Sequence, residues 1–105
     1  MQEQLRIYTI EPGELAEWIE EWRRHVAPLR ERLGFKVVAA WTIEETNQFV
    51  WILRFDGADW KAADVAYYAS PERTAMTPDP ARHIAKAEQW FIRRVDQART
   101  TAISS

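Results

Sequence analysis

The sequence predicts an α+β domain with a ferredoxin-like βαββαβ order and an antiparallel sheet. Three observations lead to this prediction: a strand followed by a long amphipathic helix, two apolar strands joined by a polar turn, and a second helical segment followed by a last strand. This is the order of a split βαβ fold. The 105 residues suffice for one domain, which we place at residues 5–95, with a disordered tail over residues 99–105.

The first strand and the first helix have clear patterns. β-branched and aromatic residues predict a strand over Leu5–Ile10. In the helix that follows, Pro28 lies inside the pattern and predicts a bend near Arg24, and Gly34 predicts a left-handed C-cap. The apolar positions of this helix recur with a 3.6-residue period: Leu15, Trp18, Ile19, Trp22, Val26, Leu29 and Leu33.

Residues 35–43 and 48–56 predict a β-hairpin, since the polar residues 44–47 separate two apolar runs. We place Ile43 opposite Gln48, which puts Arg54 opposite Val37. One face then carries Phe35, Val37, Ala39, Trp41, Ile43, Val50, Ile52 and Arg54. The other carries Val38, Ala40, Phe49, Trp51, Leu53 and Phe55. Both faces are apolar, so each needs a cover.

The C-terminal third is less regular. A second helix is predicted from about Ala58 to Ser70, and short helical turns are predicted where Ser70 and Asp79 each precede a proline. Periodicity over residues 81–95 fits either a helix or a strand. We favour a short helix to about Lys86 and a strand over Ala87–Val95, because a three-stranded sheet would leave the edge of the first strand bare.

The topology also predicts a homodimer. Right-handed crossovers place both helices on the same side of the sheet, so the other apolar face stays uncovered. Leaving four or five large apolar side chains in water forgoes roughly 1.5 to 3 kcal/mol each. We therefore expect a two-fold dimer in which the sheets of two copies face each other.

Composition excludes several classes of function. A net charge of -2 with mixed signs argues against nucleic-acid partners, and the absence of cysteine excludes disulfides, thiol catalysis and zinc fingers. No apolar run is long enough to predict a membrane span, and the polar N-terminus does not read as a signal peptide, so we expect a cytoplasmic protein without membrane contacts.

Several short stretches together resemble the NIPSNAP family. The resemblance implies a dimeric α/β-barrel fold, but the family has no common activity or catalytic signature to carry over. Related barrels include cofactor-independent monooxygenases and haem enzymes, so the fold supports several chemistries. Ala40 departs from the family, which usually has glycine nearby. The stretches that carry the resemblance are Arg6-Ile-Tyr, Pro12-Gly13, Pro28-Leu29, Gly34-Phe35, Val37-Val-Ala-Ala-Trp41 and Leu53-Arg-Phe55.

Three residues are candidates for catalysis. His25 lies at the rim of the buried helix stripe, where a neutral imidazole can act as a general base, or simply be a half-buried structural histidine. Arg54, a charge on an apolar face, can stabilise an oxyanion or form an ion pair at an interface. Tyr67 can supply a hydroxyl donor inside the fold.

The six tryptophans are many for a small domain. Core and dimer packing explain most of them, and about two can line a pocket for a flat aromatic or polyketide-like ligand. Trp18, Trp22 and Trp41 are the candidate ligand-binding residues. We expect no metal and no cofactor, although Glu21 and His25, with His83 as a third ligand, form a weak alternative metal set.

The sequence therefore predicts a small homodimer that binds a hydrophobic, aromatic or polyketide-like molecule and, in an enzymatic version, transforms it without a cofactor. The alternative is a non-catalytic protein-interaction module. A deep cavity lined by His25 and Trp41 favours the first, and a packed core with no cavity above about 300 Å³ favours the second.

Overall fold

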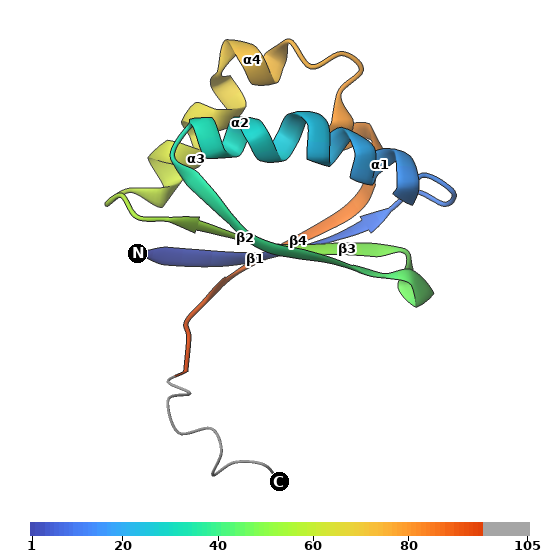
Figure 1. Cartoon of the computed structure of the whole chain (residues 1–105), viewed down its shortest axis with the longest axis horizontal. Coiled ribbons are helices and arrows are strands. Elements are labelled where there is room, and N and C mark those ends of the chain that lie inside the picture. The colour runs from blue at the N-terminus through green and yellow to red at the C-terminus, as the bar shows by residue number, and fades with distance from the viewer. Residues whose placement is uncertain (96–105) are drawn as a thin grey trace, which may run out of the picture.

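The structure is a computed structural model that describes residues 1–95, and the predicted tail over 99–105 lies outside these residues. Its four strands form one antiparallel sheet in the order β2-β3-β1-β4, with the helices on one face (Figure 1). The ferredoxin-like βαββαβ prediction is confirmed. Within the described part of the chain, no helix is long and apolar enough to cross a membrane.

The strands are β1 (Gln2–Ile10), β2 (Phe35–Ile43), β3 (Gln48–Phe55) and β4 (Ile84–Ile92). The helices are α1 (Leu15–Glu21), α2 (Ala27–Arg32), α3 (Trp60–Ala69) and α4 (Pro71–Thr74). Three further turns are the π-helical η1 (Trp22–Val26) and the 3₁₀-helical η2 (Glu44–Thr46) and η3 (Pro80–His83).

Where the sequence predicts a bend near Arg24, the structure has the π-helical turn η1, which joins α1 to α2. The N–H of Ala27 donates to the carbonyl of Trp22, five residues back. Pro28 has no N–H to give the carbonyl of Arg24, so the wider turn lies where the α-helical ladder is already interrupted. Gly34, at φ +98°, ends the helix as predicted.

The C-terminal third follows the predicted caps but not the predicted strand boundary. The side chains of Ser70 and Asp79 accept hydrogen bonds from the N–H groups of Arg73 (3.1 Å) and Ala81 (2.9 Å), and α4 and η3 begin there. The strand was predicted to begin at Ala87. This is wrong, because η3 ends at His83 and β4 pairs with β1 from Ile84 to Ile92.

A β-bulge in β2 corrects the predicted faces of the hairpin. Ile43 lies opposite Gln48 as predicted, but the register shifts between Val37 and Ala39. A one-residue slip moves every side chain before it to the other face. Phe35 therefore faces the helices with an exposed fraction of 3%, and Arg54 lies opposite Lys36, not Val37.

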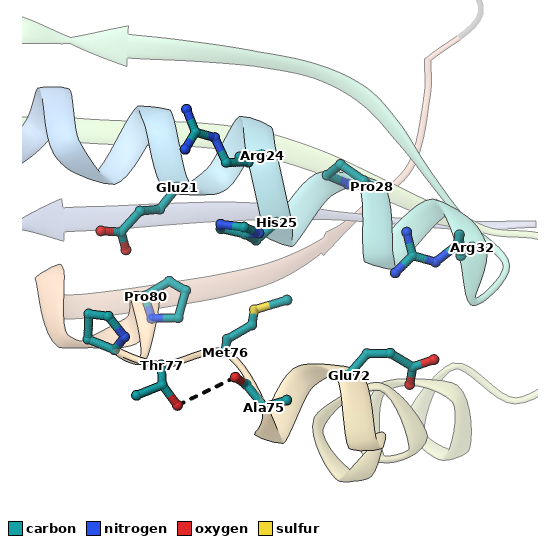
Figure 2. A pocket seen from close by; sticks show the side chains of 11 residues that line it. Glu21, Arg24, His25, Pro28, Arg32, Glu72, Ala75, Met76, Thr77 and Pro80 are labelled. Carbon is teal, nitrogen blue, oxygen red and sulfur yellow. Dashed lines mark hydrogen bonds between the residues drawn. The ribbon is translucent and has the colours of Figure 1, made fainter.

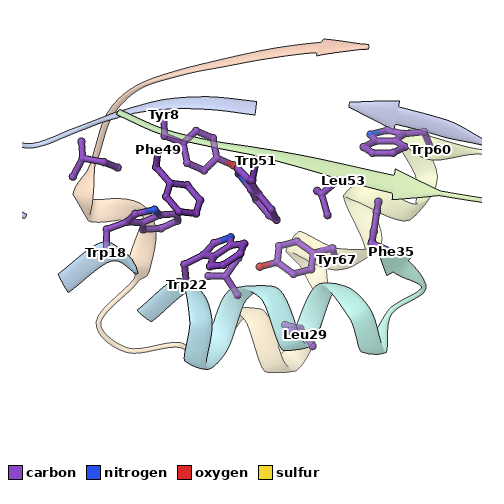
Figure 3. Packing of buried hydrophobic residues seen from close by; sticks show 12 residues of the cluster. Tyr8, Trp18, Trp22, Leu29, Phe35, Phe49, Trp51, Leu53, Trp60 and Tyr67 are labelled. Atoms are coloured by element: carbon purple, nitrogen blue, oxygen red, sulfur yellow. The ribbon is translucent and has the colours of Figure 1, made fainter. Parts of the chain in front are cut away.

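The core between the helices and the sheet is built from aromatic side chains (Figure 3). Trp22 packs edge-on against Trp51 (ring centroids 5.4 Å apart) and Phe49 (4.9 Å). Trp18 packs in the same manner against Tyr8 at 5.6 Å. Most of the aromatic residues of the chain are thus packed in this core.

The second face of the sheet carries large apolar residues and has no helix over it within residues 1–95 (Figure 1). Trp41, Ile43 and Trp90 have exposed fractions of 51%, 41% and 59%. The strand registers place six further apolar residues on this face, here called the open face: Leu5, Ile7, Ala39, Val50, Ile52 and Ile92. Both faces therefore carry large apolar side chains, as predicted, but neither is purely apolar, since Lys36 and Arg54 lie on the open face and Gln4 and Arg6 on the face toward the helices.

Candidate functional site

A cavity of about 50 Å³ lies between the helices and the sheet. Its walls come from three strands (β1, β3 and β4), from all four α-helices and from the turns η1 and η3, so distant parts of the chain meet there. The wall residues are mainly aromatic or basic and include Tyr8, Trp18, Arg30, Trp51, Tyr67 and Arg73. This combination of flat rings and charged donors makes it the candidate site.

Arg6 of β1 does not line the cavity but donates to two residues that do, Tyr8 and Tyr68, and it is completely buried. Its Nε donates to Gln4 Oε1 at 2.8 Å, and Nη2 donates to Asp64 Oδ1 at 3.2 Å. Nη1 donates to the hydroxyls of Tyr8 (3.4 Å) and Tyr68 (3.3 Å). Burial alone would lower the pKa of Arg6, but the two tyrosines and the aspartate outweigh it and raise this pKa, so the guanidinium stays charged.

Arg30 of α2 shares the same carboxylate. Its Nη1 donates to Asp64 Oδ1 at 2.8 Å, and its guanidinium lies 3.7 Å from the ring centroid of Tyr67 and 4.7 Å from that of Phe35. Its exposed fraction is 1%. One aspartate therefore ties a strand arginine to a helix arginine, and this frame fixes the floor of the site.

Several buried donors around the cavity have no acceptor. The Tyr67 hydroxyl and the indole N–H groups of Trp18 and Trp51 find no hydrogen-bond partner among residues 1–95. All three side chains are at most 2% exposed. Burial raises the pKa of Tyr67, so its phenol is protonated at neutral pH and can donate. Buried polar groups are normally paired, so these donors are available to an acceptor that enters the cavity, whereas the indole N–H of Trp22, equally unpartnered within residues 1–95, does not line it.

His25 lies elsewhere, in a cleft of about 580 Å³ between the long helix and the segment that contains α4 (Figure 2). Glu21, Pro28 and Arg32 line the helix side of this cleft, and Met76 lines the other. His25 is solvent-exposed. The structure thus places His25 beside a large cleft, but on the far side of the helix from the sheet.

The other predicted site residues divide between two places. Tyr67 and Trp18 line the cavity, and Trp22 is buried next to it. Trp41 and Arg54 lie on the open face, where Arg54 Nε is 3.5 Å from Asp56 Oδ1. The structure therefore does not bring His25 and Arg54 together within one chain. None of the pockets described among residues 1–95 is lined by both His25 and Trp41. The core cavity of about 50 Å³ is also below the size of about 300 Å³ that separates the two functional hypotheses, so by itself it favours the interaction module.

Sequence reasoning missed Arg6, Arg30, Asp64 and Arg73. A signal for Arg6 existed, because Gln4, Arg6 and Tyr8 alternate on the strand face that should have been purely apolar. No such signal marks Arg30, which a regular helix would place beside the stripe rather than within it. The wide turn η1 lags behind α-helical rotation and so brings Arg30 alongside Leu29 into the buried face.

A second polar cluster surrounds His83. Its Nδ1 is 2.7 Å from Glu14 Oε1, and its Nε2 is 3.2 Å from Glu21 Oε2. Ligand atoms of Glu17, Glu21 and His83 lie within 4.8 Å of one another, a spacing that can hold a metal ion. Arg82 already donates to both Glu21 oxygens, at 3.0 and 2.7 Å, and so supplies a cation here. Of the three residues that the sequence offers as a possible metal site, Glu21 and His83 are in contact, and His25 is not part of this cluster.

The His83 cluster predicts a pH-dependent contribution to stability. Burial alone would lower the pKa of His83, but the hydrogen bonds to Glu14 and Glu21 outweigh it, and this pKa rises above 6.5. A raised pKa means that protonation favours the folded state. The stabilisation should be complete below about pH 6.5 and disappear as the pH rises through the folded-state value. We expect His83→Gln to be more destabilising at pH 5.5 than at pH 8.5 in urea unfolding, and an equal loss at both would contradict this.

A sequence profile of the NIPSNAP family matches residues 3–104. The chain belongs to the NIPSNAP family. A search of curated proteins finds no match. Among solved structures, a NIPSNAP domain protein from Burkholderia xenovorans is similar, with 19% identity, a TM-score of 0.78, and coverage of 90% of this chain and 95% of that one. A NIPSNAP family protein of unknown function from Agrobacterium tumefaciens is similar at 18% identity and a TM-score of 0.80, covering 94% and 92%.

The fold of this NIPSNAP protein also extends beyond the family. A structure described as an antibiotic biosynthesis monooxygenase is similar at 15% identity with a TM-score of 0.65, covering 91% of this chain and all of that one. Identity this low shows a shared fold only. What the NIPSNAP chain does must therefore be argued from its own cavity and its own open face.

Proposed function

We propose that this NIPSNAP protein is a homodimer that binds a hydrophobic, aromatic small molecule between the helices and the sheet of each subunit. The observation that carries this proposal is the aromatic cavity with its unpartnered buried donors. Tyr68 and Arg73 line this cavity and also an adjoining groove of about 360 Å³. The groove has the size of a small-molecule site, and the cavity offers the polar contacts that orient a ligand.

The dimer follows from the open face. Trp41 and Trp90 would stay exposed to solvent in a monomer, on a sheet face that also carries apolar residues such as Leu5, Val50 and Ile52. Monomeric proteins rarely expose an apolar patch of this kind without a partner. A second copy is the natural occupant because a two-fold pairing covers both sheets with one self-complementary surface. Pairing two open faces leaves the cavities on the outer sides of the sheets accessible.

An enzymatic version is chemically possible at this site without a cofactor. A hydroxyl and indole N–H groups that point at a developing negative charge stabilise it, as in an oxyanion hole. Tyr67 and Trp51 can take this role. His25, in its separate cleft, would be a base only for a substrate that reaches that cleft. The monooxygenase that shares the fold supports this version by analogy.

Native mass spectrometry of the freshly purified protein tests both parts. We expect twice the mass of one chain, with a small molecule released on denaturation. Tyr67→Phe should lose the molecule, whereas Val65→Ala should keep it, since Val65 lies exposed on the same helix.

Tryptophan fluorescence with naphthalene-type and phenyl-type compounds provides a second test, because Trp18 and Trp51 line the cavity. If no molecule is retained and none of these compounds quenches the fluorescence in a saturable manner, small-molecule binding is rejected and the interaction-module alternative is favoured.

A further inference from the structure

All the polar side-chain atoms around the cavity that have no hydrogen-bond partner among residues 1–95 are hydrogen-bond donors. The Tyr67 hydroxyl and the Nε1 atoms of Trp18 and Trp51 have no acceptor within the described chain, nor do the Nε atoms of Arg30 and Arg73. Indole and guanidinium groups cannot accept hydrogen bonds. A ligand atom that satisfies this wall must therefore be an acceptor.

The charges of the side chains around the cavity also favour an acceptor, and in particular a negatively charged one. Arg6 and Arg30 share the single carboxylate of Asp64, and Arg73 pairs with Asp79 at 2.9 Å. Three guanidinium groups thus face two carboxylates, which leaves one positive charge in excess. Arg6 and Arg30 are at most 1% exposed, so water does not screen this charge well. An acceptor that carries a negative charge fits better than a neutral one.

The volume of the cavity further limits which ligand groups can enter it. About 50 Å³ corresponds to one or two water molecules and so holds a single small group rather than a whole ligand. A planar carboxylate has this size and accepts hydrogen bonds on both oxygens. Tyr68, Arg73 and Met76 line the adjoining groove, which has room for the remaining part of the molecule.

We infer that the cavity binds the carboxylate of an aromatic or aliphatic organic acid, with Tyr67, Trp18 and Trp51 donating to its oxygens and Arg30 and Arg73 supplying the positive charge. The apolar part of the acid occupies the groove beside Tyr68. This inference rests on the proposed function and specifies its ligand class. The competing occupant of so small a polar space is water alone.

The test compares an acid with its neutral, nearly isosteric amide. Phenylacetate and phenylacetamide are titrated into the whole protein by calorimetry, and acetate and acetamide are added in thermal-unfolding experiments. We expect phenylacetate to bind at least tenfold more tightly than phenylacetamide, and acetate to raise Tm while acetamide does not. Equal binding of acid and amide would overturn the carboxylate inference and leave the proposed function standing. Binding of neither probe, with no Tm shift, would overturn the inference by assigning the cavity to water.

Single substitutions at the cavity test whether phenylacetate binds there. Tyr67→Phe removes only a hydroxyl, and it should weaken phenylacetate binding roughly tenfold, as expected for a lost hydrogen bond to a charged group. The same variant should unfold at an equal or higher temperature than the wild type without ligand, because the lost hydroxyl has no partner in the described chain. Arg73→Gln should also weaken the acid, whereas Arg23→Gln, at an exposed helix position, should not. Unchanged acid binding in both Tyr67→Phe and Arg73→Gln would place the acid elsewhere and overturn the inference.

Discussion

Asp64→Ala is expected to lower the free energy of unfolding by about 3 kcal/mol, because it leaves two buried arginines without their shared carboxylate. Arg6 and Arg30 have exposed fractions of 0% and 1%, so neither guanidinium can turn to water. The carboxylate itself is 23% exposed, which places the expected loss at the lower end of what breaking a buried ion pair costs. Urea unfolding followed by circular dichroism measures the loss.

Asp56→Ala is the matched control. Asp56 also pairs with an arginine, Arg54, but at 3.5 Å and with a side chain that is 69% exposed. An exposed pair of this kind contributes at most about 1 kcal/mol. Equal losses in Asp56→Ala and Asp64→Ala would mean that other groups compensate the buried guanidinium charges, and that the Asp64 frame does not hold the cavity floor.

The predictions from sequence succeeded where periodicity is strong and local. The stripe from Leu15 to Leu29 fixes a helix whichever way the rest of the chain folds, and the turn between Ile43 and Gln48 fixes the hairpin register near it. Beyond the bulge at Val38 the register depends on which face Phe35 must fill, and that is a tertiary question. The boundary of β4 was missed for the same reason, since its pairing with β1 decides where it begins.

The candidate site was only partly accessible to sequence reasoning. Trp18 follows from helical spacing, because spacing tells which side of a helix faces inward. For Tyr67 and Tyr68, spacing says only that at most one of the two faces inward. Asp64 could not be found in this way, because its importance comes from Arg6 and Arg30, which are 58 and 34 residues away along the chain. His25 was predicted at the rim of the buried stripe, but the structure has it exposed and on the far side of the helix from the sheet. The segment around Met76 that forms the other wall of its cleft depends on the path of the chain after α4, which helical spacing does not predict.

The turn η1 links the fold to the site. Pro28 interrupts the hydrogen-bond ladder, the chain adopts a wider turn, and the change in phase directs Arg30 to the sheet, where it meets Asp64 and Tyr67. A feature that weakens the helix locally therefore positions a charged group in the core. The cavity wall depends on an irregular turn, in agreement with the frequent occurrence of π-turns at functional sites.

Ile52→Lys is expected to dissociate the proposed homodimer, because it places a charge at the centre of the open face. Ile52 pairs with Leu5 of β1 and Ala39 of β2, so apolar neighbours flank it on both sides. Burying an unpaired ammonium group between two sheets costs several kcal/mol, which raises the dissociation constant by on the order of a hundredfold or more. Sedimentation velocity over a range of concentrations measures the change. Val65→Lys is the matched control, because Val65 is 60% exposed on α3, away from this face, and should leave the dimer intact. A wild-type protein that sediments as one folded chain, with Trp41 and Trp90 open to an aqueous quencher, would reject the proposed dimer.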